Sequence, residues 1–223
     1  MPDRIIPIFP LNLVLFPGMV LPLRIFEPRY QTMVRKLLAD DRKFGVALIA
    51  EGEEVGEAAT PCRVGTIAEI SSVEASADGQ LMLLCVGLRR FRIEEMIEGE
   101  PYLQAAVTIL EEGDPAEPVD EALLAACVEG LEGYIESLTR ITNLSISVPA
   151  DELSPIDLSY LMAALLQVEN DQKQALLEVE DAEERLQEAL ELLKEERADI
   201  DNFLAQNRAM GDTFYRGHRI SLN

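Results

Sequence analysis

The sequence predicts an α+β protein: a small β-barrel in the first half, then a helical bundle that ends in a long C-terminal helix. Short apolar runs separated by Gly and Pro fill the first half, whereas apolar residues recur at helical spacing in the second. The charge changes as well, since residues 1–110 carry 15 acidic and 11 basic side chains and residues 111–223 carry 26 and 8. We therefore expect two domains, 1–112 and 113–223, joined near the acidic linker Glu111–Pro118.

Six or seven short strands are expected in the first half, which is typical of a small barrel. The Pro17-Gly18 pair predicts a turn between the first two strands, and Asp78-Gly79 predicts a hairpin. One helix is expected at Glu27–Asp40, where apolar residues recur every three or four positions. The expected strands are Arg4–Phe9, Met19–Ile25, Phe44–Ala50, Val64–Val73, Leu81–Gly87, Phe91–Ile97 and Leu103–Leu110.

Four helices are expected in the second half. Ser154 is the expected N-cap of one, with Pro155 in the first turn and Asp157 three residues after the cap. Asp181 and Glu184 form a similar pair at the start of the last helix. The expected helices are Asp120–Ile141, one from Ser154-Pro155 to about Leu166, Asp171–Glu178, and one from Asp181 to about Asn207.

Charge and composition exclude several function classes. The net charge of −22 disfavours nucleic acids and anionic membranes, because both bind cationic side chains. The apolar stretch from Ile5 to Phe26 contains four prolines, so we expect no membrane span there. The three cysteines, at positions 62, 85 and 127, form no CxxC pair, which favours free thiols and a cytoplasmic location.

The sequence also lacks the groups that most catalysts need. It has no Gly-x-x-x-x-Gly-Lys-Ser/Thr motif and no Gly-x-Ser-x-Gly motif, and its single histidine, His218, lies near the C-terminus. None of the four lysines has an apolar sequence environment that would suit a Ser–Lys dyad. We therefore expect a protein that is not an enzyme and holds no cofactor or metal.

Two features remain as candidates for binding. The turn Leu11–Phe16 is strongly apolar and is either a contact surface or part of the core. The basic run Arg89–Arg92 either contacts a partner or protects an exposed strand edge, and an exposed edge explains such charges well.

Several ordered motifs resemble the N-terminal substrate-binding domain of Lon proteases, in the form of stand-alone bacterial Lon-domain proteins. They are Ile6–Leu11, Val14–Leu23, Arg24–Tyr30, Phe44–Val46, Val64–Ala68, Asp78-Gly79, Val86–Phe91, Leu161–Leu166, Lys173–Glu178 and Glu184–Leu186. The resemblance covers roughly residues 5–195 and implies a PUA-like β-barrel followed by a helical bundle. No ATPase or Ser–Lys protease domain lies within these 223 residues, so the resemblance implies binding without catalysis.

We accordingly expect a non-catalytic module that binds unfolded or hydrophobic polypeptide segments. An adaptor that pairs with another protein or with itself through the bundle is the alternative, and a separate ATPase or protease is a further candidate partner. RNA binding is opposed by the charge. The expected contact residues are Leu13, Phe16, Met19, Phe26 and Met33, with Arg89 and Arg90 adding selectivity for polar or acidic groups. The candidate helix seam of the adaptor is Ala182, Leu186, Ala189, Leu193 and Ile200.

Overall fold

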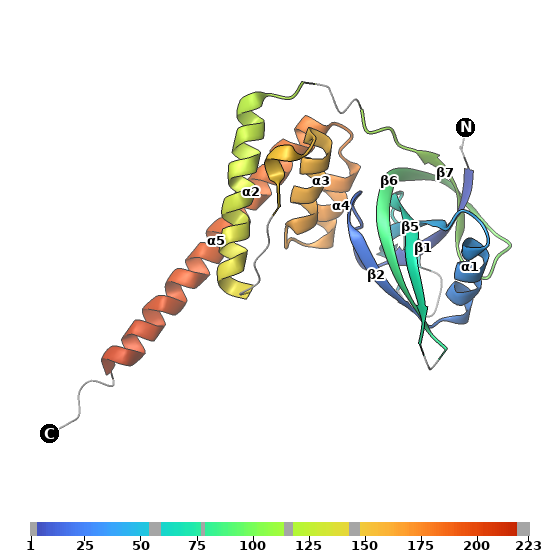
Figure 1. Ribbon diagram of the computed structural model, residues 1–223, viewed down its shortest axis with the longest axis horizontal. Helices are drawn as coiled ribbons and strands as arrows, with labels where there is room; N and C mark the ends of the chain where they lie inside the picture. Colours follow the sequence, from blue (N-terminus) through green and yellow to red (C-terminus); the bar gives the residue numbers. More distant parts are fainter. Residues whose placement is uncertain (1–3, 54–58, 77–78, 114–117, 143–147, 218–223) are drawn as a thin grey trace.

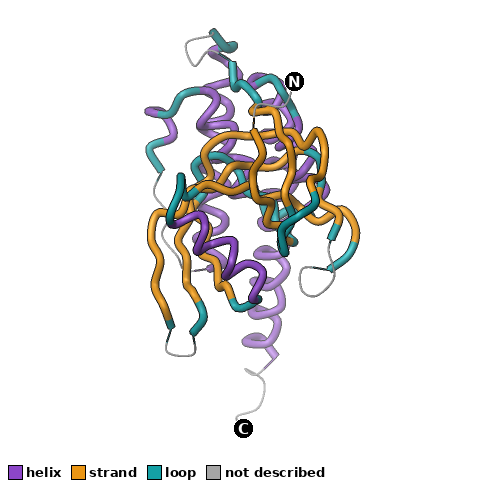
Figure 2. The backbone as a smooth tube through the Cα atoms, turned by 90° about the vertical axis from the view of Figure 1, so that its right-hand side faces the viewer, coloured by secondary structure: helices purple, strands orange, loops and turns teal. Residues whose placement is uncertain are grey.

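The barrel and the helical bundle lie side by side, and the last helix projects away from both (Figure 1). The computed structural model describes residues 4–53, 59–76, 79–113, 118–142 and 148–217. Figure 2 views the molecule from the barrel side, with the helix that follows the second strand lying against the barrel and the bundle behind it. The expected α+β fold class is confirmed.

Five strands close into a ring in the order β1-β7-β6-β5-β3, and a parallel pairing of β1 with β3 completes it. Every other pairing is antiparallel. Strand β2 pairs only with the first part of β6, and the short β4 pairs with β3. The strands are β1 (Arg4–Leu11), β2 (Val20–Ile25), β3 (Lys43–Glu51), β4 (Thr60–Pro61), β5 (Val64–Ala75), β6 (Leu81–Ile97) and β7 (Gln104–Ile109).

One expectation about the strands was wrong, because Leu81–Gly87 and Phe91–Ile97 are a single strand, β6. Gly87 does not end the strand and instead allows another segment to approach it. A Cβ atom at this position would lie 2.4 Å from the carbonyl oxygen of Phe16. The Gly87 N–H donates to the Met19 oxygen at 2.9 Å, and the Gly87 oxygen accepts from the Gly18 N–H at 2.9 Å. Gly87 is therefore where the turn between β1 and β2 docks onto β6.

The Pro17-Gly18 turn forms as the sequence predicts. The Met19 N–H donates to the Phe16 oxygen at 3.1 Å, and Gly18 has a φ of +81°, a conformation that glycine adopts without steric cost. The hairpin between β5 and β6 also forms, although Asp78 of its predicted Asp-Gly pair lies outside the described residues. Both turns fix which parts of β2, β5 and β6 face each other.

The barrel core is apolar and includes one face of helix α1 (Pro28–Leu38). Four of the five residues in the predicted stripe of this helix, Tyr30, Met33, Val34 and Leu37, are buried. They pack in one cluster with inward-facing residues of the strands, among them Leu23 of β2. The fifth, Leu38, is partly buried and packs against the same cluster. The helix thus covers part of the barrel interior and buries side chains that a sheet alone would leave exposed.

The helical half contains α2 (Glu121–Thr142), α3 (Pro155–Leu165), α4 (Asn170–Glu178) and α5 (Ala182–Gly217), with a short 3₁₀ turn η1 (Ala150–Glu152). The predicted caps form: the Ser154 hydroxyl accepts the Asp157 N–H at 3.1 Å, and the Asp181 carboxylate accepts the Glu184 N–H at 2.8 Å. No helix in the described part of the chain is both long and apolar enough to cross a bilayer.

One of the three buried apolar clusters among the described residues spans both halves. Phe16 and Val64 from the barrel belong to the same buried cluster as residues of α2 to α5, and the Phe16 and Tyr160 rings lie 6.3 Å apart. The strands end at Ile109 and the helices resume at Glu121, on either side of the predicted boundary at 112. The division into two domains, 1–112 and 113–223, stays a prediction.

Candidate functional site

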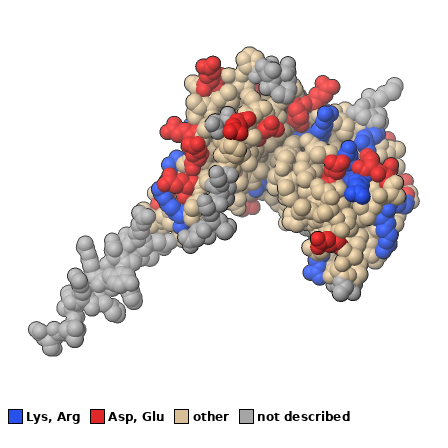
Figure 3. Space-filling view, viewed as in Figure 1, with Lys and Arg blue, Asp and Glu red and all other residues tan. Residues whose placement is uncertain are grey.

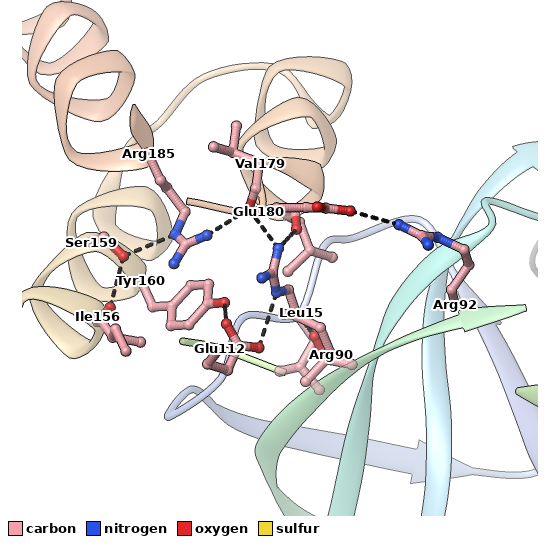
Figure 4. Close-up of polar contacts among 12 residues, drawn as sticks. Leu15, Arg90, Arg92, Glu112, Ile156, Ser159, Tyr160, Val179, Glu180 and Arg185 are labelled. Atoms are coloured by element: carbon pink, nitrogen blue, oxygen red, sulfur yellow. Dashed lines mark hydrogen bonds and ion pairs between the residues drawn. The ribbon is translucent and has the colours of Figure 1, made fainter. Parts of the chain in front are cut away.

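A buried arginine on β6 links the barrel to the bundle. The Arg90 side chain is fully buried, and its Nε lies 3.0 Å from a carboxylate oxygen of Glu112. Its Nη1 donates to the Leu177 carbonyl oxygen at 2.8 Å. The same nitrogen donates to the Val179 carbonyl oxygen at 2.6 Å (Figure 4). These carbonyl groups lie at the end of α4 and just beyond it, where helix geometry leaves oxygens without partners. Arg90 therefore caps α4 from the barrel.

A second buried arginine, Arg185 of α5, completes this junction. Its Nε donates to the Ser159 hydroxyl at 2.8 Å, its Nη1 donates to the Val179 oxygen at 2.6 Å, and its guanidinium lies 4.1 Å from the centre of the Tyr160 ring. The Tyr160 hydroxyl donates to Glu112, and burial raises the pKa of this tyrosine. Burial also lowers the pKa of Arg185. Most polar groups of these residues hold elements together, whereas Nη2 of Arg185 is buried without a hydrogen-bond partner among the described residues. Together the residues form a structural junction.

Neither interpretation of the basic run Arg89–Arg92 applies to all of it. The protective-edge interpretation was wrong, because β6 is paired on both sides here: Phe91 lies opposite Gly65 of β5 and Ile109 of β7. Arg90 is buried in the junction, and Arg92 lies 3.0 Å from Glu180. Arg89 is exposed and lines a shallow cavity beside Leu110 and Glu111.

The outer face of β2 and β6 carries an exposed apolar surface. The strand register places Val20 opposite Val86, Pro22 opposite Leu84, and Arg24 opposite Met82. Val20 is 56% exposed, Met82 42% and Leu84 41%, although all three are large apolar side chains. The barrel surface near the helical half is largely uncharged in Figure 3. We call Val20, Pro22, Met82, Leu84 and Val86 the outer apolar face.

A cavity of about 360 Å³ lies between the Pro17-Gly18 turn and helix α3, next to the outer apolar face. Met19, which precedes Val20 in the chain, lies at one side, and Leu161 and Ala164 of α3 lie at the other. Met19 is held in place because its sulfur accepts the Phe16 N–H at 3.3 Å. Among the described residues that line this cavity, only Asp157 has a side chain that is charged at neutral pH.

A second cavity, of about 280 Å³, lies between the start of α1, β2 and the end of β1. Its lining includes Leu13, Phe26 and Tyr30, and Phe26 is half exposed at 50%. The cavity borders Pro22 and so meets the outer apolar face from the other side. The outer apolar face thus borders two cavities, and the lining of the second also includes the charged residues Arg24 and Glu27.

The structure divides the predicted contact residues into two groups. Leu13 and Phe26 line the cavity beside α1, Met19 lines the cavity beside α3, and Arg89 is exposed. In contrast, Phe16, Met33 and Arg90 are fully buried. These three were misplaced as contact residues, because packing and hydrogen bonds inside the fold occupy the groups that a ligand would need.

The prediction missed Val20, Met82 and Leu84, although the sequence carries a signal for them. All six residues of Leu81–Val86 are apolar. A strand with one solvent-exposed face instead alternates apolar and polar residues. Only one face of β6 points into the small barrel, so Leu83 and Cys85 are buried, whereas Met82 and Leu84, which alternate with them, are exposed. A strand apolar on both faces therefore indicated a second apolar surface.

The described residues contain no group of three or more His, Cys, Asp or Glu side chains that could hold a metal ion. Burial raises the pKa of Cys85 and of Cys127 to about 11, which keeps both thiols protonated at neutral pH. His218 lies outside the described residues. The absence of a cofactor and of catalysis stays a prediction.

Curated relatives of this chain are Lon proteases. It is 32% identical over 200 residues to the Lon protease of Cytophaga hutchinsonii, covering 85% of this chain and 24% of the relative. It is 31% identical over 197 residues to Lon protease 2 of Myxococcus xanthus, covering 87% and 24%. The chain thus spans about a quarter of the length of these relatives.

Two solved structures match this chain over nearly the whole of their own length. A Lon N-terminal domain protein from Xanthomonas campestris is 30% identical with a TM-score of 0.64, covering 84% of this chain and 97% of that one. The N-terminal domain of the Mycobacterium avium complex Lon protease, at 24% identity, has a TM-score of 0.66 and shares the fold, with coverage of 86% and 98%. The family model described as the ATP-dependent protease La (LON) substrate-binding domain matches residues 5–195 of this chain. This chain therefore belongs to the LON substrate-binding domain family.

Proposed function

We propose that this protein binds apolar segments of unfolded polypeptides on the outer apolar face and in the two cavities beside it. The observation that carries the proposal is the exposure of Val20, Met82 and Leu84 on adjacent strands. Single exposed apolar residues are ordinary, but a contiguous apolar patch marks an interaction surface. Membership of a substrate-binding family supports a polypeptide as the partner.

The chemistry of the surface suits weak binding to many sequences. Met19 and Met82 have unbranched, polarisable side chains that can adapt to different apolar partners. The outer apolar face carries no charge of its own, and Arg24 lies at its end, opposite Met82. Binding would then depend on apolar area and would discriminate poorly between Leu, Phe and Met in a ligand.

A membrane surface is the main competing partner for an exposed apolar face. Anionic lipids attract basic side chains, whereas this chain has a net charge of −22. The alternative function, an adaptor that pairs through the last helix, has less support. Three of the five residues proposed for its helix seam, Leu186, Ala189 and Leu193, are fully buried inside the bundle. The net charge and the burial of these three residues therefore support an unfolded polypeptide as the partner.

The test measures binding of a fluorescein-labelled 15-residue peptide with a Leu- and Phe-rich centre and Ser-rich flanks, by anisotropy. Met82→Ser removes apolar area at the end of the outer apolar face that lies beside Arg24. We expect about fivefold weaker binding, because losing about 40 Å² of buried apolar area costs about 1 kcal/mol.

Met96→Ser is the matched control. Met96 lies on the same strand and is 40% exposed against 42% for Met82, but it pairs with Ala105 of β7, away from β2. We expect its affinity to equal that of the parent protein. Equal affinities of Met82→Ser and Met96→Ser, or no binding by the parent protein, would contradict the proposal.

A further inference from the structure

The cavity beside α3 combines an apolar wall with a single charge. Met19, Leu161 and Ala164 supply apolar surface, and the Tyr160 ring forms another part of the lining. Asp157 is exposed and lies at this cavity, whose volume is about 360 Å³. A long side chain with an apolar stem and a cationic end matches such a lining, because its stem can lie on apolar surface while its charge meets the carboxylate.

The Asp157 carboxylate has room for such a partner. One of its oxygens, Oδ2, accepts the Ser154 hydroxyl at 2.6 Å, and its N–H bonds back to the same hydroxyl at 3.1 Å. Among the described residues, none of the ion pairs includes Asp157. A carboxylate accepts several hydrogen bonds, so the cap leaves capacity for a cation.

We propose that this cavity takes a lysine or arginine side chain that flanks the apolar segment of a bound polypeptide, with its charged end at Asp157. The inference rests on the proposed function, because the outer apolar face would hold the neighbouring apolar residues. It assigns a ligand class, apolar segments with basic flanks, and one residue that selects it.

The charge of the whole chain acts in the same direction. Residues 111–223, which include α3, carry 26 acidic and 8 basic side chains. This field attracts basic segments and repels acidic ones over distances up to about a Debye length. The two effects can be distinguished by mutation. Any change of net charge alters the attraction by the overall electrostatic field, whereas only a change at Asp157 alters binding of the basic side chain in the cavity.

The experiment compares three peptides with the same Leu- and Phe-rich centre and with Lys, Ser or Glu flanks. We expect the Lys-flanked peptide to bind the parent protein most tightly and the Glu-flanked peptide least tightly at low salt. The Asp157→Asn variant should bind the Lys-flanked peptide about two- to fivefold more weakly, in the range of one partly exposed ion pair. Its affinity for the Ser-flanked peptide should not change.

Glu184→Gln is the matched control, because it removes one negative charge at the equivalent position after the Asp181 cap, on a different helix. Its affinity for the Lys-flanked peptide should stay close to that of the parent protein. Equal losses in both variants would overturn the cavity assignment and leave only the field.

Equal binding of all three peptides to the parent protein would overturn the inference and leave the proposed function intact. Failure of all three peptides to bind would instead contradict the proposed function. Thermal unfolding of both variants separates a loss of binding from a loss of folded protein.

Discussion

Replacing Arg90 by methionine removes the polar link between the barrel and α4 while keeping a long apolar stem. The substitution breaks the 3.0 Å ion pair with Glu112 and two hydrogen bonds to the Leu177 and Val179 carbonyl oxygens. The Val179 oxygen keeps its 2.6 Å bond from Arg185. The Leu177 oxygen loses the Arg90 donor and stays in a buried environment.

The expected cost is about 3 kcal/mol of unfolding free energy. A buried carbonyl left without a donor costs about 1 to 3 kcal/mol, and breaking a buried ion pair costs about 3 to 5 kcal/mol. We count about 2 kcal/mol for the carbonyl and about 1 kcal/mol for the ion pair, below the range for a fully buried pair, because the Glu112 side chain is 19% exposed and water can solvate it. For a chain of this size, the midpoint of thermal unfolding should fall by about 6 to 12 °C.

Urea unfolding followed by circular dichroism measures this difference, and Arg92→Met is the matched control. Arg92 lies two residues further along β6, but its pair with Glu180 is exposed, so its loss should cost less than about 0.5 kcal/mol. A loss in Arg90→Met within 1 kcal/mol of the loss in Arg92→Met would refute the structural role of the junction.

Three further predictions concern packing, pH and thiol reactivity. Gly87→Ala should lower the free energy of unfolding by about 2 to 4 kcal/mol, because the new Cβ atom would lie 2.4 Å from the Phe16 carbonyl oxygen. Unchanged thermal unfolding would show that the turn between β1 and β2 can separate freely from β6. Burial raises the pKa of Cys85 and of Cys127 from 9.0 to about 11. Because the unfolded chain therefore loses these two protons at a lower pH than the folded chain, the free energy of unfolding should fall as the pH rises from about 9 toward 11. Urea midpoints at pH 8 and pH 10 measure this fall, which the double Cys85→Ala, Cys127→Ala variant should reduce. With a thiol reagent at neutral pH, the half-buried Cys62 should react first, and equal rates for the three cysteines would contradict the assigned burial.

Local sequence signals placed most elements correctly because their causes are local. Ser154 and Asp181 cap the helices that follow them, and Pro17-Gly18 forms the turn that its φ requirement allows. The helical spacing around Met33 predicts which face of α1 is buried. In each case, the residues that determine the structure lie within a few positions of one another.

Gly87 shows where local reasoning fails. A glycine between two apolar runs has the same local signature whether it ends a strand or admits another backbone. The segment that approaches it includes Phe16, which lies 71 residues earlier in the chain, and no sequence window contains both. The single long strand β6 was therefore visible only after the chain had folded.

The sequence by itself determined the α+β class, most of the helices and strands, and the unusual double-faced apolar run at Leu81–Val86, but neither the short β4 nor the continuity of β6. Tertiary structure alone decided that Phe16 and Arg90 are internal and that Val20, Met82 and Leu84 are exposed. The physical reason is that an apolar or charged residue carries the same chemistry in either place. Its exposure depends on which distant segments pack over it, and here those segments are the Pro17-Gly18 turn and the helices of the second half.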